Sequence, residues 1–172
     1  MKKISSKAST SLSIGATFGL LAILLGTLFF IPTIVIVMVK VHLSSYEVLK
    51  LFFTVPIDLS FNTLVMITTI IVYILNALGL VTGVLLLLIL LNVKKDSIFV
   101  FNNVSYLRAC SWLCIIAGLL FFTLGSVYWT CLLLGFAAGL VGLMLRVVKN
   151  IIERAVEIKE ENDLTIWQRG RF

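Results

Sequence analysis

The stretch Ala109–Leu145 decides the fold: ACSWLCIIAGLLFFTLGSVYWTCLLLGFAAGLVGLML holds 37 residues and no charged side chain. As one α-helix it would be ~55 Å long, whereas the hydrocarbon core of a bilayer is ~30 Å thick. The stretch therefore has to fold back on itself. We predict the turn at Gly125-Ser126, because glycine relaxes the backbone and the rings of Tyr128-Trp129 favour the membrane interface. This predicts two spans, at about residues 109–124 and 127–145.

Two more uncharged runs precede this stretch, Ile14–Val39 and Leu64–Val93. Each exceeds the roughly 20 residues that one crossing needs. The first run follows a lysine-rich start, as in a signal peptide, but the apolar region of a signal peptide has only about 7–15 residues and ends in small residues. We therefore predict an uncleaved span whose outer part is kinked by Pro32. The second run is long enough that its helix has to tilt or protrude.

The composition agrees with this class. Hydrophobic residues make up 60% of the 172 residues and charged residues 13%, against about 45–50% and about 25% in soluble domains. A soluble chain of this size could not bury so much apolar surface in one core. We expect an all-α integral membrane protein with a single domain over residues 1–172, a four-transmembrane-helix bundle followed by a tail at 146–172.

The basic residues predict the orientation. Of the 14 lysines and arginines, only Lys40 and Lys50 lie in the connection between the first two spans. The other twelve lie in the N-terminal tail, the middle loop and the C-terminal tail: Lys2, Lys3, Lys7, Lys94, Lys95, Arg108, Arg146, Lys149, Arg154, Lys159, Arg169 and Arg171. The positive-inside rule then places both termini in the cytoplasm, and we expect the protein in the plasma membrane. Topology and anionic lipid account for the net charge of +6 better than direct contact with nucleic acid.

Two segments outside the spans have helical patterns. Ser44-Ser45-Tyr46-Glu47 fits a capping box and Pro56 a stop, which predicts a short outer helix over residues 44–56, either in the membrane interface or as a lid on the bundle. After the fourth span the helix should continue to about Asn162, with residues 163–166 extended. Its apolar stripe has to pack on the middle loop, on lipid or on a partner, and consists of Ile151, Ile152, Ala155 and Ile158.

Small residues recur at the four-residue spacing that lets membrane helices approach closely. The pairs are Gly15 and Gly19, Gly79 and Gly83, and Gly135 and Gly139. Packing within the bundle is the expected role, and homodimerisation is the alternative. Asn76 lies in the middle of the second span, one turn before Gly79 on the same face. Its amide needs a partner in hydrocarbon, so it is either an interhelical hydrogen-bonding group or a polar point on a substrate path.

Catalytic chemistry has little support. The three cysteines, Cys110, Cys114 and Cys131, are an odd number inside apolar runs, and His42 has no second histidine, so neither a disulfide framework nor a metal site is predicted. The predicted spans contain no Asp, Glu, Lys, Arg or His, which argues against proton relays, coupled transport and voltage sensing. We expect no enzymatic activity, no cofactor and no metal.

Two further stretches, 99–108 and 154–166, carry a family resemblance. The matching positions are Phe99, Asn103, Val104, Leu107 and Arg108 in the first, and Glu161, Asp163, Leu164, Thr165 and Ile166 in the second. With four spans, the chain resembles the YoaS-like bacterial membrane protein family, domain of unknown function twenty-nine seventy-five. The resemblance implies no known enzymatic activity. It also implies a membrane partner of a small Cro/C1-type helix-turn-helix regulator, because the genes of such proteins often lie side by side.

The residues themselves suggest local roles. Asn103 could cap the third helix, Arg108 would lie among the headgroups, and residues 163–166 could dock against the middle loop. The leading hypothesis is a non-enzymatic membrane partner or sensor for a small cytoplasmic helix-turn-helix regulator. The alternatives are an immunity protein against an antimicrobial peptide and a passive transporter subunit.

Overall fold

The computed structural model describes residues 2–49, 61–95, 100–125 and 128–169, and side chains within 10–41, 62–95, 100–125 and 128–162. It contains four helices: α1 (Lys2–Leu49), α2 (Phe61–Lys94), α3 (Phe101–Gly125) and α4 (Thr130–Arg169). The described residues contain no strand. This confirms the prediction of an all-α four-helix bundle, and the break between α3 and α4 includes the predicted turn.

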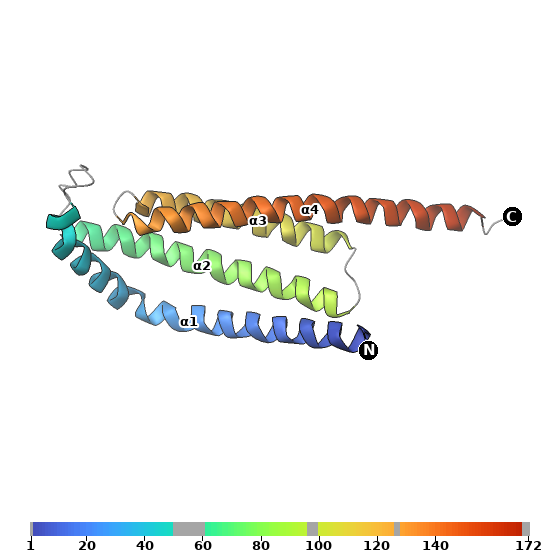
Figure 1. The fold of residues 1–172 in the computed structure, drawn as a ribbon, viewed down its shortest axis with the longest axis horizontal. Coiled ribbons are helices and arrows are strands. Elements are labelled where there is room, and N and C mark those ends of the chain that lie inside the picture. The colour runs from blue at the N-terminus through green and yellow to red at the C-terminus, as the bar shows by residue number, and fades with distance from the viewer. Residues whose placement is uncertain (1, 50–60, 96–99, 126–127, 170–172) are drawn as a thin grey trace.

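The four helices run lengthwise beside one another (Figure 1), with α1 packed on α2, α2 on α3 and α3 on α4. Figure 1 shows that α1 begins and α4 ends at the same end of the bundle, where α2 also leads into α3. We call this end the basic end, because α2 ends there at Lys94, followed by Lys95. The connections from α1 to α2 and from α3 to α4 lie at the opposite end.

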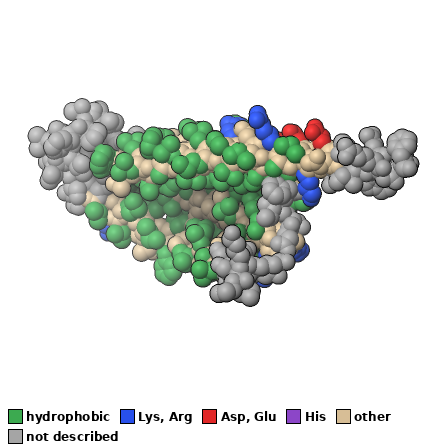
Figure 2. Space-filling view, turned by 45° about the vertical axis from the view of Figure 1, so that its right-hand side comes forward, with side chains coloured by type: hydrophobic (Ala, Val, Ile, Leu, Met, Phe, Trp, Pro, Cys, Tyr) green, Lys and Arg blue, Asp and Glu red, His purple; other side chains and the backbone are tan. Residues whose placement is uncertain are grey.

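Every helix contains a segment long and apolar enough to cross a membrane: Thr10–Val41, Asn62–Lys94, Phe101–Gly125 and Thr130–Asn162. Figure 2 shows hydrophobic side chains covering most of the face in view, with Lys and Arg and then Asp and Glu toward one end. Large apolar side chains point outward, including Phe29 at 86% exposure and Phe136 at 61%. A surface of this size without polar cover is unfavourable in water but suits contact with lipid chains.

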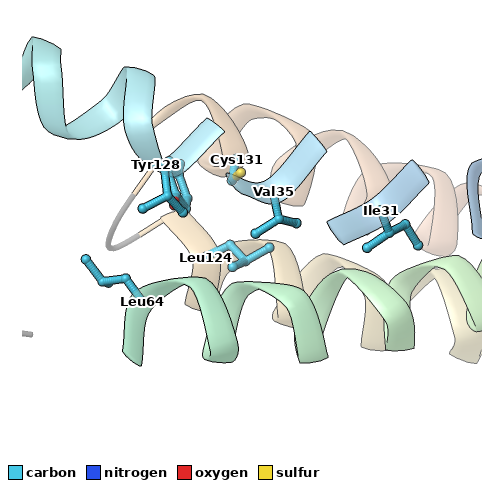
Figure 3. Close-up of a cluster of buried hydrophobic side chains, with 7 residues drawn as sticks. Ile31, Val35, Leu64, Leu124, Tyr128 and Cys131 are labelled. Carbon is cyan, nitrogen blue, oxygen red and sulfur yellow. The ribbon is translucent and has the colours of Figure 1, made fainter. Parts of the chain in front are cut away.

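The main cluster of buried apolar side chains lies toward the end opposite the basic end, and it draws on all four helices (Figure 3). It consists of Ile31, Val35, Val39, Leu64, Leu124, Tyr128 and Cys131. Pro32 lies inside α1 next to this cluster. Figure 1 shows α1 bending toward its C-terminal end. Pro32 lies in the C-terminal half of this helix, consistent with the predicted kink.

Two predicted boundaries are wrong. The capping box does not begin a new helix, because α1 continues through residues 44–49; the rest of the predicted outer helix, 50–56, lies outside the described residues. Residues 163–166 are not extended, because α4 continues to Arg169. In both cases no proline or glycine interrupts the segment, neither within 40–49 nor within 162–169, so the helix continues through the predicted break.

Candidate functional site

The contact between α3 and α4 depends on glycine. A Cβ atom added at Gly118 would lie 3.0 Å from the carbonyl oxygen of Gly135 and 3.2 Å from the backbone nitrogen of Gly139. A Cβ atom added at Gly135 would in turn lie 3.0 Å from the carbonyl oxygen of Gly118. The two backbones therefore approach to a distance that excludes larger residues at these points. Nearer the basic end, the hydroxyl of Ser111 donates a hydrogen bond of 2.8 Å to the carbonyl oxygen of Gly142.

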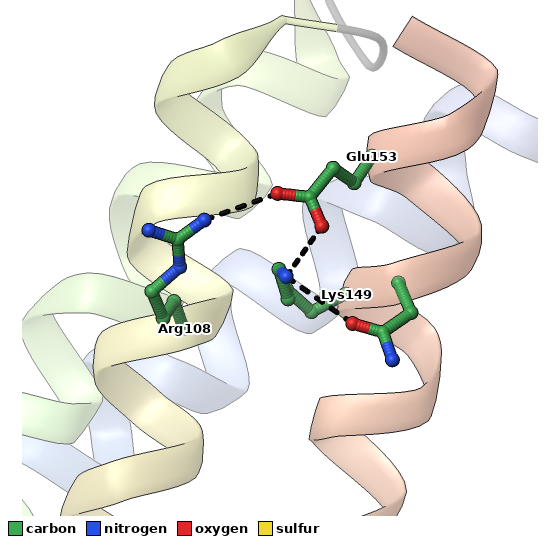
Figure 4. A network of polar contacts seen from close by, with 4 residues as sticks. Arg108, Lys149 and Glu153 are labelled. Carbon is green, nitrogen blue, oxygen red and sulfur yellow. Dashed lines mark hydrogen bonds and ion pairs between the residues drawn. The ribbon is translucent and has the colours of Figure 1, made fainter. Parts of the chain in front are cut away.

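A network of charged side chains joins α3 to α4 at the basic end (Figure 4). Arg108 Nη2 donates to Glu153 Oε1 at 3.0 Å, and Lys149 Nζ lies 2.5 Å from Glu153 Oε2. Lys149 also donates to Asn150 Oδ1 at 3.2 Å. The side chain of Lys149 is 14% exposed and that of Arg108 is 58% exposed. An exposed ion pair contributes only about 0–1 kcal/mol, so the main consequence of this network is that it fixes the position of Arg108.

One turn closer to the membrane, the same side of the α3–α4 contact carries an aromatic and a cation. The guanidinium carbon of Arg146 lies 4.6 Å from the ring centre of Trp112. Trp112 is 50% exposed and Arg146 is exposed. Because Arg108 and Trp112 are four residues apart on α3, they lie on one face of that helix. We call Arg108, Trp112, Arg146, Lys149 and Glu153 together the boundary cluster.

The second helix is held to the third by an amide pair. Asn92 Nδ2 donates to Asn103 Oδ1 at 2.7 Å, and Asn103 is 2% exposed. Asn103 therefore lies inside α3 and does not cap it: the helix starts at Phe101, and the backbone nitrogen of Asn103 already donates to the carbonyl oxygen of Val100 at 3.0 Å. The residue pattern of each helix does not show that Asn92 and Asn103 lie within hydrogen-bonding distance in the folded bundle, so this contact was not predicted.

The first two helices meet around Asn76. Its Nδ2 donates to Thr27 Oγ1 at 2.8 Å and to the carbonyl oxygen of Leu24 at 3.4 Å, while Asn76 Oδ1 is buried with no hydrogen-bond partner in the described part of the chain. A Cβ added at Gly79 or Gly83 would meet side chains of α1, Leu24 at 3.6 Å and Leu21 at 2.7 Å respectively. The second-span glycines thus face α1, as an intramolecular packing role requires.

The first-span glycines are placed differently. A Cβ added at Gly15 or Gly19 would meet nothing within 4 Å, and both residues are exposed. The predicted packing stripe of α1 therefore faces away from the described residues of this chain, and α1 instead presents larger side chains such as Leu21 and Leu24 to α2. Gly118 shows the reverse: it lies in a close contact that the sequence pattern did not predict. No second glycine lies four residues from it on α3, so the spacing rule does not select it.

The residues of the family resemblance lie mainly at the basic end. Val104 and Leu107 are buried at 2% and 6% exposure, while Arg108 and Glu161 are exposed. Phe99 lies outside the described residues. The set at 163–166 belongs to the helical end of α4, where side chains are not described, and it does not form an extended segment against the middle loop.

The described residues contain no group of three or more His, Cys, Asp or Glu that could hold a metal ion. Cys110, Cys114 and Cys131 are free thiols, and Cys110 is fully buried. Two polar arrangements among the described residues could interact with a ligand or partner: the boundary cluster, which has exposed cations, and the Asn76 contact, which has a buried amide oxygen without a partner.

The helices and these contacts define a multi-pass integral membrane protein. The comparison with known families is consistent with this class: residues 6–166 match the family described as "Protein of unknown function (DUF2975)". The chain belongs to this family, as the resemblance at the two motif stretches indicated. No curated protein matches the chain, and no solved structure matches it either.

Proposed function

We propose that this protein is a non-enzymatic membrane protein that binds a cytoplasmic partner through the part of α4 beyond the bilayer. The observation that carries the proposal is the length of α4, whose 40 residues make a helix of ~60 Å against a hydrocarbon core of ~30 Å. About half of α4 then extends into water. Figure 1 shows this end of α4 reaching beyond the other three helices.

The extension presents apolar side chains on the face turned away from α3. Ile151 is 63% exposed and Ile158 is 59% exposed, whereas Val156, on the other side of the helix, is buried at 2%. Residues seven apart in a helix share a face, so Ile151 and Ile158 continue the exposed stripe of Met144 toward the C-terminus. An amphipathic helix with anchors at this spacing suits helix-in-groove binding.

The proposed partner is a small helix-turn-helix regulator encoded by a neighbouring gene. For this partner to reach α4, the basic end has to face the cytoplasm. The family resemblance supports the choice of partner, and the distribution of twelve basic residues against two supports the orientation. Binding to the extension would keep such a regulator at the membrane and reduce its concentration at DNA.

The test uses full-length protein in lipid nanodiscs and the purified neighbouring helix-turn-helix protein. The Ile158→Asp variant should weaken binding at least tenfold, because it puts a charge in the centre of the apolar contact. Glu157→Gln is the matched control, since it changes an exposed neighbour off the stripe and should bind as the native protein does. Equal binding by all three proteins would contradict the proposal.

A second candidate function is that of a passive transporter subunit, which would let a small polar solute pass. One observation supports it, the environment of a single amide oxygen. Asn76 Oδ1 is a buried acceptor between α1 and α2 with no hydrogen-bond partner among the described residues, and a polar solute could supply the donor. Deletion of residues 151–172 and the Asn76→Leu change separate the two functions. Loss of the cellular phenotype on truncation, with normal insertion, favours the partner; loss only with Asn76→Leu favours the solute.

A further inference from the structure

The boundary cluster lies at the depth where lipid phosphates are expected. Arg146 is 16 residues beyond the start of α4 at Thr130, and Arg108 is 17 residues before the end of α3 at Gly125. At 1.5 Å per residue both lie about 25 Å from the opposite end of their helices, which is near the edge of a ~30 Å hydrocarbon layer. Trp112 has the partly exposed position that tryptophan adopts at the membrane interface.

The guanidinium of Arg146 lies over the ring of Trp112 and still has its N–H donors available. An aromatic ring attracts a guanidinium through its charge and does not accept conventional hydrogen bonds from all five of its N–H donors. Arg146 makes no hydrogen bond or ion pair with the described residues. This planar set of donors matches the two oxygens of a phosphate group.

The second arginine of the cluster is positioned by a carboxylate. Glu153 accepts from Arg108 through one guanidinium nitrogen and also pairs with Lys149, so that both cations are held close to the α3–α4 contact. Three cations and one carboxylate give the cluster a net charge of +2 (3 − 1). Farther out, α4 has four acidic residues and three basic ones, a net charge of −1 (3 − 4): Glu157, Glu160, Glu161 and Asp163 against Arg154, Lys159 and Arg169. The positive charge is therefore concentrated at the boundary itself.

Apolar side chains lie directly below the cluster on the membrane side. Leu119 is 61% exposed and lies two turns from Trp112 on the same face of α3, and Ile116 next to it is 43% exposed. Leu143 of α4, less than one turn before Arg146, is 54% exposed. A ligand with a charged head and long apolar chains would cover both the cations and these side chains, whereas free phosphate would cover only the cations.

We propose that the boundary cluster is a binding site for the phosphate of an anionic membrane lipid, held by Arg146 and Arg108 with the acyl chains along Leu119 and Ile116. Trp112 and Glu153 position the two arginines. The site is separate from the partner-binding face of α4, because Ile151 and Ile158 lie on the opposite side of that helix from Glu153. It would bind lipid whether or not the extension binds a partner.

The experiment uses Trp112 as the reporter. The Trp129→Phe, Trp167→Phe protein keeps Trp112 as its only tryptophan. It is placed in phosphatidylcholine nanodiscs that contain equal mole fractions of either brominated phosphatidylglycerol or brominated phosphatidylcholine, since bromine quenches indole fluorescence on contact. The ratio of the two quenching strengths gives the local preference for the anionic lipid and does not depend on the brightness of each variant.

We expect phosphatidylglycerol to be preferred over phosphatidylcholine at Trp112 by about fivefold or more. One basic side chain near an anionic surface strengthens binding by on the order of fivefold. Arg146→Gln should abolish most of this preference, and Arg108→Gln should reduce it. Arg154→Gln is the matched control, because it removes the same charge from the same helix at an exposed position outside the cluster. It should keep the full preference.

Three outcomes would overturn the proposal. Equal quenching by the two lipids would show that no preference exists at Trp112. If Arg154→Gln reduced the preference for the anionic lipid as much as Arg146→Gln does, the preference would come from general surface charge and not from the boundary cluster. Removal of the preference by 10 mM inorganic phosphate, on the order of a weak single-site affinity, at constant ionic strength would show that the site recognises phosphate without the lipid. Each variant is first checked for normal insertion and thermal stability, so that a folding defect is not read as a loss of binding.

Discussion

Gly118 and Gly135 touch through their backbones: each carbonyl oxygen lies 3.0 Å from the place where the other residue would carry a Cβ atom. This reciprocal contact is where α3 and α4 approach most closely among the described glycine contacts that involve backbone atoms. Lipid provides no hydrophobic force between helices, so the stability of this pair depends on such close packing. The helix that carries the proposed partner site is therefore anchored at a point with no room for a side chain.

The first prediction tests that contact. Gly118→Ala should lower the thermal stability of the protein in detergent, by about 1–3 kcal/mol in free energy of unfolding, because the new methyl group overlaps backbone atoms that cannot move alone. Gly139→Ala should be tolerated, since a Cβ there would meet nothing within 4 Å. Circular dichroism melting of both variants checks this. Equal losses would mean that the α3–α4 register differs from the one described.

The second prediction concerns Asn76 and Thr27. Asn76→Leu removes an interhelical hydrogen bond of 2.8 Å and should cost about 0.6–2 kcal/mol. In a double-mutant cycle with Thr27→Val, the two losses should not add, because either change alone already breaks the bond. Unfolding in mixed micelles measures all four proteins. Strict additivity would indicate that the two side chains do not interact.

The third prediction concerns the amide pair at the basic end. Asn103→Leu should destabilise the protein by about 1–3 kcal/mol, because it leaves the amide of Asn92 without its partner. The double variant Asn92→Leu, Asn103→Leu should recover part of this loss, since neither amide of the pair is then left without the other. The same unfolding assay serves as readout. A double variant less stable than the single one would show that Asn92 has a separate role.

The fourth prediction is the membrane orientation. Reporter domains fused after Lys50 and within the turn at 125–128 should lie outside the cell, and those fused after Lys95 and after Phe172 should lie in the cytoplasm. The basic residues predict this arrangement through the positive-inside rule. Each position is fused to two reporters in turn, one active only in the cytoplasm and the other active only outside it, and their activities show on which side the position lies. A C-terminal fusion active only outside would remove the basis for a cytoplasmic partner.

The number and type of helices could be predicted because the apolar runs are longer than a bilayer requires and are separated by charged segments. A turn within 109–145 followed from length, since 37 uncharged residues exceed one crossing, and its place at Gly125-Ser126 followed from the glycine and the aromatic rings of Tyr128-Trp129. The contact faces could not be predicted in the same way. The spacing of Gly15 and Gly19 identifies a face that allows close approach, but only the position of α2 decides that α1 uses Leu21 and Leu24 instead.

The polar contacts depended even more on the fold. Asn92 and Asn103 lie in separate helices, and Arg108 and Glu153 are 45 residues apart, so only the folded bundle brings them together. The predicted end of α4 failed for a related reason. Asp163 and Thr165 have low helix propensity, but helix formation is cooperative, and residues at the end of a long helix continue it when no strong breaker intervenes.

The uninterrupted course of α4 from Thr130 to Arg169 has a mechanical consequence. A single helix is a stiff rod, so its outer half cannot change direction independently of the half inside the bilayer. A change in tilt of about 10° within the membrane would carry the far end, about 30 Å away, sideways by about 5 Å. Stretching or thinning of the bilayer alters helix tilt. It would therefore move the exposed apolar face at the far end of α4, which lies well beyond the membrane.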